Sequence, residues 1–198
     1  MIFNSLGRTL RKEFRQTFRS LKYRNLRIFF LGQIISLSGT WMQMVALSWL
    51  VWRLTKSPVL LGIVEGSNLL PMLLFGILGG TLADRFDRRK LMITTQALAM
   101  CQATVLAVLT LTGNIQVWHC IGLALFLGTV NAFEVSSRQA FIVNLVQRKD
   151  LVNTVSLGSS MFNVARSLGP AAAGILVAAA GEGICFALNA FSYLAALT

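Results

Sequence analysis

Charged residues are scarce in this chain: 13% of its 198 residues are Asp, Glu, Lys or Arg, whereas a soluble domain carries about 25%. Acidic residues are the scarcer kind, at 7 against 18 Lys and Arg. Apolar residues make up 55% of the chain, and the mean hydropathy is +0.67. This balance excludes an ordinary soluble domain and indicates a lipid bilayer as the solvent.

Residues that carry chemistry are also few. The single histidine, His119, stands beside Trp118 at the edge of an apolar run. There is no paired-acid motif and no G-x-x-x-x-G-K-[ST] phosphate loop. Cys101, Cys120 and Cys185 lie inside apolar runs without a C-x-x-C spacing, which favours structural thiols over a metal or redox site. The sequence therefore argues against an enzyme, a bound metal or cofactor, and ATP-driven transport.

The net charge of +11 would suit a nucleic-acid-binding protein. The basic residues, however, lie in patches between apolar runs of spanning length, with no basic face and no stacking aromatic residues beside them. No nucleic-acid partner is predicted.

Six apolar runs are long enough to be considered as membrane spans, since a helix needs about 20 residues to cross the hydrocarbon. They cover 28–52, 59–83, 91–112, 117–133, 152–180 and 183–198. The first lacks a small-residue cleavage site, so we expect it to stay in the membrane rather than act as a signal peptide. We interpret the mixed stretch 134–146 as a helix end that continues along the membrane surface. The last run is short and has no charged stop after Thr198, so we expect a sixth helix cut short by a boundary.

Basic residues are distributed very unevenly between the two sides that these spans define. One side holds Arg8, Arg11, Lys12, Arg15, Arg19, Lys22, Arg24, Arg27, Arg85, Arg88, Arg89, Lys90, Arg138, Arg148 and Lys149, and the other holds Arg53 and Lys56. Because cytoplasmic loops are enriched in Lys and Arg, the N-terminus is predicted to be cytoplasmic. The basic segment 1–27 is either an amphipathic helix on anionic lipid or a solvated tail.

The turn between the second and third runs, Gly80-Thr81-Leu82-Ala83-Asp84-Arg85-Phe86-Asp87-Arg88-Arg89-Lys90, is the most informative stretch. Glycine allows helices to approach closely, Asp84 places a carboxylate near the membrane surface, and the bases can anchor the turn to lipid phosphates. An ordinary positive-inside loop would explain the bases but not the glycines and Asp84.

This turn resembles the signature G-x-L-A-D-R-x-G-R-[RK] of the major facilitator superfamily. The residues that match are Gly80, Leu82, Ala83, Asp84, Arg85, Arg88 and Arg89. The resemblance implies a conformational latch in which Asp84 and Arg88 act against the opposite half of the transporter. Asp87 replaces the family's second glycine, a variant that resembles the enterobactin and macrolide exporter branch.

The fifth run carries a second resemblance. Its Gly169, Pro170 and Gly174 match the G-P-x-x-G-G element of the superfamily's antiporters, with Ala173 in place of a glycine. Proline bends a helix and small residues allow close packing. This resemblance favours export over import, and the departure at Ala173 weakens that inference.

Ionisable residues inside a span are costly and are therefore candidates for function. Glu65, Glu134 and Arg166 are the candidates for coupling transport to protons. Glu65 and Arg166 are within reach of each other if their helices face, either as a functional pair or as one that only neutralises itself. Glu134 has the alternative of pairing with Arg138 one turn later.

Polar residues in the first and fourth runs suit a substrate cavity, because the resemblance implies that these two helices line it. Gln43 and Asn131 can bond either a polar substrate or a neighbouring helix. Trp41 would contribute an adaptable apolar wall.

Together these features predict an all-α membrane protein, the six-helix N-terminal bundle of the major facilitator fold, built from two inverted three-helix repeats. Ser38-Gly39-Thr40 and Leu127-Gly128-Thr129 are a trace of that repeat. The resemblance implies proton-coupled efflux of small amphipathic molecules such as siderophores, macrolides or drugs across the bacterial cytoplasmic (inner) membrane. It also implies a partner, either a C-terminal six-helix half or a second copy. A half-size transporter acting as a dimer and a non-transporting remnant or scaffold remain as alternatives.

Overall fold

The computed structural model describes residues 22–85 and 87–197, apart from the side chains of 77–85, 143–144 and 149. Every regular element of this described part is helical: α2 (Arg24–Thr55), α3 (Pro58–Arg85), α4 (Arg88–Leu111), α5 (Val117–Leu145), the short 3-10 turn η2 (Arg148–Asp150), α6 (Leu151–Ala180) and α7 (Glu182–Leu197). Five of these helices are long and apolar enough to cross a membrane, and α7 is a shorter apolar helix. The predicted all-helical membrane fold is confirmed.

Several helices extend beyond the apolar runs. Helix α2 begins at Arg24 rather than at Ile28, and α5 continues through the mixed stretch to Leu145. A helix satisfies its own backbone hydrogen bonds and can therefore pass from hydrocarbon into the headgroup region, where long basic side chains reach outward to water. The uncharged run therefore marks only the part of each helix that must be apolar to cross the hydrocarbon, and the helix itself extends further.

Asp87 caps the start of α4. Its Oδ1 accepts hydrogen bonds from the backbone N–H groups of Arg89 at 2.9 Å and Lys90 at 3.2 Å, so the carboxylate caps the start of α4. Asp87 has φ −60°, which an L-residue adopts without strain. The replacement of the family's glycine by aspartate is thus compatible with the backbone and adds a helix cap.

The helices contact one another in a pattern that is preserved when the first three are exchanged for the last three. Helix α3 packs on α5 as α6 packs on α2, α4 packs on α5 as α7 packs on α2, and α4 and α7 pack on each other. This is the relation expected of two three-helix repeats. Because each repeat has an odd number of helices, the second repeat is inverted relative to the first.

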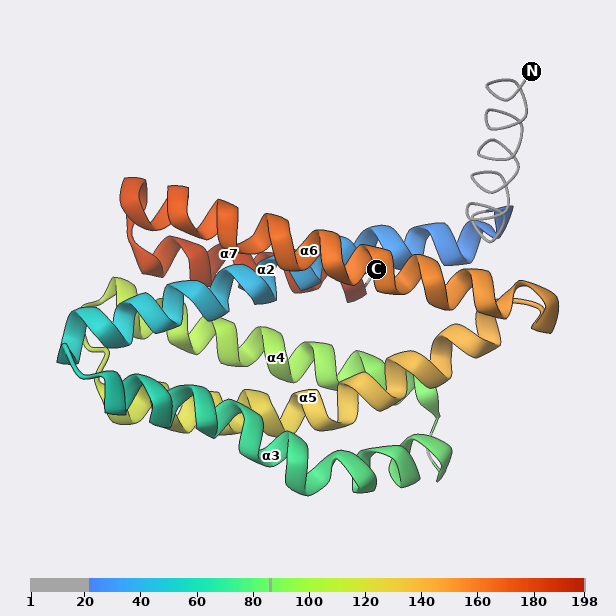
Figure 1. Cartoon of the computed structure of the whole chain (residues 1–198), viewed down its shortest axis with the longest axis horizontal. Coiled ribbons are helices and arrows are strands. Elements are labelled where there is room, and N and C mark those ends of the chain that lie inside the picture. Colours follow the sequence, from blue (N-terminus) through green and yellow to red (C-terminus); the bar gives the residue numbers. More distant parts are fainter. Residues whose placement is uncertain (1–21, 86, 198) are drawn as a thin grey trace, which may run out of the picture.

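Successive helices run in opposite directions, and the turns therefore separate into two groups (Figure 1). The start of α2, the α3–α4 turn and the α5–α6 turn lie at one end of the bundle, at the right of Figure 1. These are the segments that carry most of the basic residues. Arg53 and Lys56 are at the opposite end, in the α2–α3 turn.

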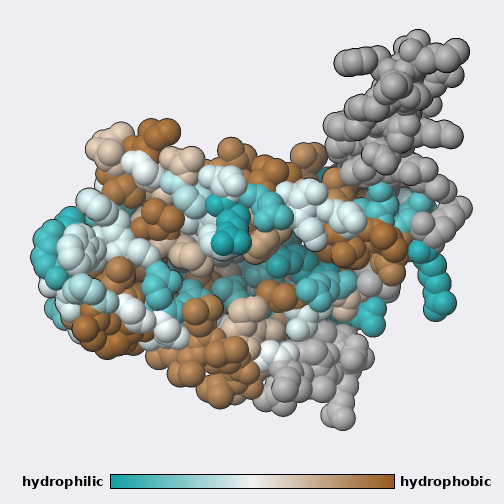
Figure 2. Space-filling model, in the orientation of Figure 1, coloured by the Kyte–Doolittle hydropathy of each residue, from teal (hydrophilic) through white to brown (hydrophobic). Residues whose placement is uncertain are grey.

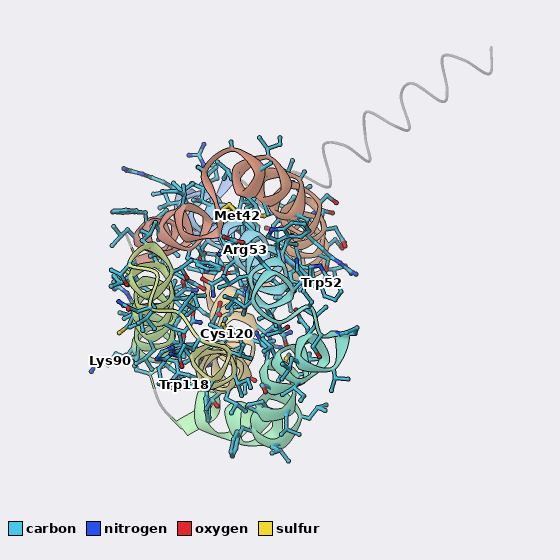
Figure 3. The ribbon with its side chains drawn as sticks, turned by 90° about the vertical axis from the view of Figure 1, so that its left-hand side faces the viewer. Met42, Trp52, Arg53, Lys90, Trp118 and Cys120 are labelled. Atoms are coloured by element: carbon cyan, nitrogen blue, oxygen red, sulfur yellow. The ribbon has the colours of Figure 1, made fainter. Side chains whose placement is uncertain are left out.

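Large apolar side chains cover the outside of the bundle. Leu73 is 78% exposed, Val152 79% and Ile175 72%, and Figure 2 shows hydrophobic surface along the upper and lower margins of the bundle, with hydrophilic surface at its left end and across the middle of this face. Inside, Met42 and Cys120 belong to a buried apolar cluster between the helices, whereas Lys90 projects outward (Figure 3). An apolar outer surface of this extent fits a protein surrounded by lipid.

Candidate transport site

A chain of buried amide side chains crosses the bundle interior. Asn189 of α7 donates to Gln43 of α2 at 2.8 Å, Gln43 donates to Gln102 of α4 at 3.0 Å, and Gln102 donates to the Leu123 carbonyl of α5 at 3.3 Å. The exposed fraction of the three amide residues is at most 2%. Gln43 thus bonds neighbouring helices, one of the two roles considered for it, and the chain links both repeats.

A small pocket opens beside this chain, between α2, α3 and α5. Its lining combines apolar residues with amides, a hydroxyl and one carboxylate: Thr40, Gln43, Met44, Leu47, Val64, Glu65, Asn68, Leu127 and Asn131. The fold therefore brings together Glu65, Gln43 and Asn131, which the sequence proposed separately. In Figure 2 hydrophilic surface fills the hollow between the α2–α6 and α3–α5 layers.

Glu65 projects from α3 toward α2, where the hydroxyl of Ser48 lies 2.5 Å from its Oε1. The same hydroxyl also lies 3.0 Å from the backbone carbonyl of Met44. Among the ion pairs of the described residues, none involves Glu65. The carboxylate is therefore held by a neutral hydroxyl rather than by a base.

Glu134, three residues after Asn131 on α5, occupies a different environment. Its Oε1 accepts from Gln96 Nε2 at 3.0 Å and from Arg138 Nη1 at 3.4 Å, one turn away on the same helix. Arg138 also lies 3.4 Å from the Oε1 of Gln33, whose Nε2 is buried and has no hydrogen-bond partner among the described residues. Glu134 is thus paired with Arg138, which the sequence offered as the alternative to a role in proton coupling.

Arg166 does not pair with Glu65, contrary to one expectation from the sequence. Its guanidinium carbon lies 5.6 Å from the ring centroid of Trp41, and Phe162 packs edge-on against the same ring at 5.7 Å. Axial offset alone suggested that Glu65 and Arg166 could meet. Glu65 instead projects from α3 toward Ser48 of α2, and Arg166 projects from α6 toward Trp41 of the same helix.

The latch residues are described only in part. Arg88 donates from Nη1 to the Ala140 carbonyl of α5 at 3.2 Å and so ties the α3–α4 turn to α5, whereas Arg89 is exposed. The side chains of Asp84 and Arg85 and the surroundings of Gly80 lie outside the described part of the structure. Their role as a latch remains a prediction.

The three residues of the helix-five motif have different surroundings. Gly169 is buried where α6 crosses α2, and a Cβ added there would lie 2.7 Å from the Ser38 carbonyl oxygen and 2.6 Å from the Trp41 Cβ. Pro170 is half-buried within α6. Gly174 is exposed, and a Cβ there would meet nothing. Close packing of this helix within the bundle thus involves Gly169 and not Gly174.

Comparison with known proteins decides the family. The family model described as transmembrane secretion effector matches residues 15–198. The chain belongs to this family of major facilitator proteins. The resemblance to the major facilitator superfamily that the sequence of the α3–α4 turn indicated is thereby confirmed.

Curated relatives of this major facilitator chain are named as transporters. The staphyloferrin A transporter of Staphylococcus aureus is 30% identical over 172 residues, which cover 86% of this chain and 43% of the relative. Macrolide efflux protein A of Streptococcus pyogenes is 26% identical over 160 residues, 78% of this chain and 39% of the relative. An uncharacterised MFS-type transporter of Bacillus subtilis is 26% identical over 163 residues, 82% of this chain and 38% of the relative. The chain spans less than half the length of these relatives.

Sequence reasoning overlooked several polar residues of this major facilitator bundle. Gln96 and Gln102 of α4 and Asn189 of α7 each bond a buried polar side chain of another helix, and Tyr193 of α7 lies 3.1 Å from the Thr40 hydroxyl. The signal was present as amides inside the third and sixth apolar runs. Because only the polar residues of the first and fourth helices were considered as candidates, these amides were missed.

Proposed function

We propose that this chain forms the N-terminal half of a secondary active exporter that moves small amphipathic molecules out of the cell in exchange for protons. The relatives' names, a staphyloferrin A transporter and a macrolide efflux protein, support siderophores, macrolides or related drugs as the class of substrate. The location that follows is the bacterial inner membrane. The excess of basic residues at one end of the bundle supports a cytoplasmic N-terminus.

One observation carries the proposal of proton coupling: the carboxylate of Glu65 lines the pocket and contacts a hydroxyl rather than a base. A coupling residue must accept a proton in one state of the transport cycle and release it in another. A carboxylate already neutralised by arginine, such as Glu134, is less free to do so. Glu65 is therefore our proton-coupling residue, with Asn131 and Gln43 beside it as the polar part of the substrate site.

Alternating access in this superfamily needs two halves that move about a central site. The pocket lies between α2, α3 and α5 of one half, so a second half would close it. In our proposal that second half is a C-terminal six-helix bundle, and Asp84 with Arg88 would latch the two halves together on the cytoplasmic side.

The experiment that tests this function measures efflux of a panel of macrolides, dyes and siderophores from cells. Three strains are compared: one expressing this chain alone, one expressing it fused to the C-terminal half of a related exporter, and one expressing that C-terminal half alone. We expect efflux only from the fusion. Efflux from this chain alone would instead establish a half-size transporter acting as a dimer, and no efflux from a correctly inserted fusion would contradict the exporter.

A further inference from the structure

Trp41, Met44 and Ser48 form a half-buried stripe along α2. Spacings of three and four residues place these positions on one face of a helix. Met44 lines the pocket and Ser48 contacts Glu65 of α3, whereas Trp41 contacts Arg166 of α6. The stripe is therefore flanked by a carboxylate on the α3 side and by a guanidinium on the α6 side.

Arg166 is at the depth where a charge is most costly. It lies near the middle of the 30-residue helix α6, about 22 Å along the helix axis from Leu151. Lipid phosphates lie at the membrane surface and so do not reach this level. An arginine at such a position faces a water-filled cavity or pairs with an anion.

Among the described residues, Arg166 has no anionic partner. Its side chain is exposed, and no described carboxylate lies within ion-pair distance of it. The guanidinium lies over the Trp41 ring, and Phe162 packs edge-on against the same ring. A guanidinium held against a ring keeps N–H donors available, and their fork matches the two oxygens of a carboxylate.

We propose that Arg166, held against Trp41, is the subsite that receives an acidic group of the transported molecule, so that this exporter prefers anionic, carboxylate-bearing substrates to cationic amines. The inference rests on the proposed function, because it assumes that the stripe of Trp41, Met44 and Ser48 lines the substrate path. It distinguishes carboxylate-bearing substrates from cationic amines, a distinction that the relatives' names do not make. Trp41 and Phe162 would contact the apolar part of the same molecule.

The test is equilibrium binding, which requires neither a proton gradient nor turnover. Fluorescein carries a carboxylate, and rhodamine 6G is a xanthene dye of similar size in which that group is an ester and the ring system is cationic. Fluorescence anisotropy of each dye is measured with this chain in nanodiscs, and the signal of empty nanodiscs is subtracted. We expect fluorescein to bind more tightly than rhodamine 6G.

Three variants assign the preference to Arg166. R166Q should weaken fluorescein binding about tenfold or more and leave rhodamine 6G unchanged, whereas R166K should recover part of the loss, because lysine keeps the charge but not the fork. Lys56→Gln is the matched control: it also removes a cation over a tryptophan, 5.9 Å from the Trp52 ring, but at the end of the bundle. K56Q should bind both dyes as the unaltered chain does.

Unchanged fluorescein binding by R166Q would overturn the proposal. So would an equal loss of both dyes, which would show that Arg166 only supports the fold. Anion binding that disappears in a fusion to a second half would assign Arg166 to an ion pair between halves and would also overturn it. Absence of transport by a fusion that still binds fluorescein through Arg166 would contradict the exporter and leave the subsite standing.

Discussion

The Ser48 hydroxyl of α2 lies within hydrogen-bond distance of two oxygens, Oε1 of Glu65 and the Met44 carbonyl, but it has one proton to donate. When Glu65 is ionised, Ser48 donates to the carboxylate. When Glu65 is protonated, its own O–H can donate to Ser48, which then donates to Met44. Both protonation states of Glu65 can thus be hydrogen-bonded in this conformation, so the site allows the carboxylate to accept and to release a proton.

Ser48→Ala removes this relay and should slow efflux by the fused protein several-fold, because the ionised carboxylate loses the hydrogen bond that stabilises it among apolar residues. Ser48→Thr keeps the hydroxyl and should retain most activity. Ser67→Ala is the control, since Ser67 is a serine of the neighbouring helix α3 whose hydroxyl donates within its own helix, to the Ile63 carbonyl. Equal efflux rates for all three variants would remove Ser48 from the mechanism.

Gly169→Ala should destabilise the bundle by about 1–3 kcal/mol, because the added methyl group has no space at the crossing of α2 and α6. Gly174→Ala adds the same methyl group to an open surface of the same helix and should leave stability nearly unchanged. Thermal unfolding in one detergent measures both variants. Similar unfolding temperatures for the two would show that the α2–α6 crossing is not as close as described.

Asn189→Leu should destabilise the chain by about 1 kcal/mol, the scale of a single interhelical hydrogen bond in a membrane protein. It leaves Gln43 Oε1 without the donor from α7. A double-mutant cycle with Gln43→Leu isolates the pair, and reversible unfolding supplies the free energies. Additive effects of the two substitutions would mean that the amide chain does not couple α2 to α7.

Asp84→Asn should impair transport by the fused protein while leaving membrane insertion intact, because the proposed latch would use the charge of Asp84. Asp87→Asn in the same turn should have little effect, since asparagine caps a helix about as well as aspartate and the Asp87 side chain bonds only the start of α4 in the described part of the chain. Efflux rate normalised to the amount of inserted protein is the measurement. Unchanged efflux by the Asp84 variant would remove Asp84 from the mechanism.

For the described part of the chain, the sequence predicted the number and order of the membrane helices because charge and turn residues mark where lipid ends. It placed the start of α2 and the end of α5 less well, since Arg24 and the stretch before Leu145 tolerate helix outside the hydrocarbon. The pairing of Glu65 with Arg166 was wrong for a different reason. Depth along a helix can be counted from sequence, whereas the rotation that turns Arg166 toward Trp41 depends on how α6 packs on α2.

The buried amides show the same limit. Gln102 and Asn189 stand among apolar residues in runs that contain few polar side chains, and their spacing alone does not show that both turn toward Gln43. Ridge-and-groove contacts between helices set those rotations. The motif at Gly80 to Arg89, by contrast, was recognisable because it is local in sequence.

The central claim, proton coupling through Glu65, is tested most directly in proteoliposomes that contain the fused exporter and an entrapped pH indicator. Substrate is added on one side, and the resulting proton flux and substrate flux are recorded for the unaltered protein and for Glu65→Gln, with Glu182→Gln as a control carboxylate paired with Arg53 at the bundle end. The account predicts coupled fluxes in the unaltered protein and in Glu182→Gln, and substrate movement that neither carries protons nor depends on pH in Glu65→Gln. Coupled fluxes that persist in Glu65→Gln would contradict it.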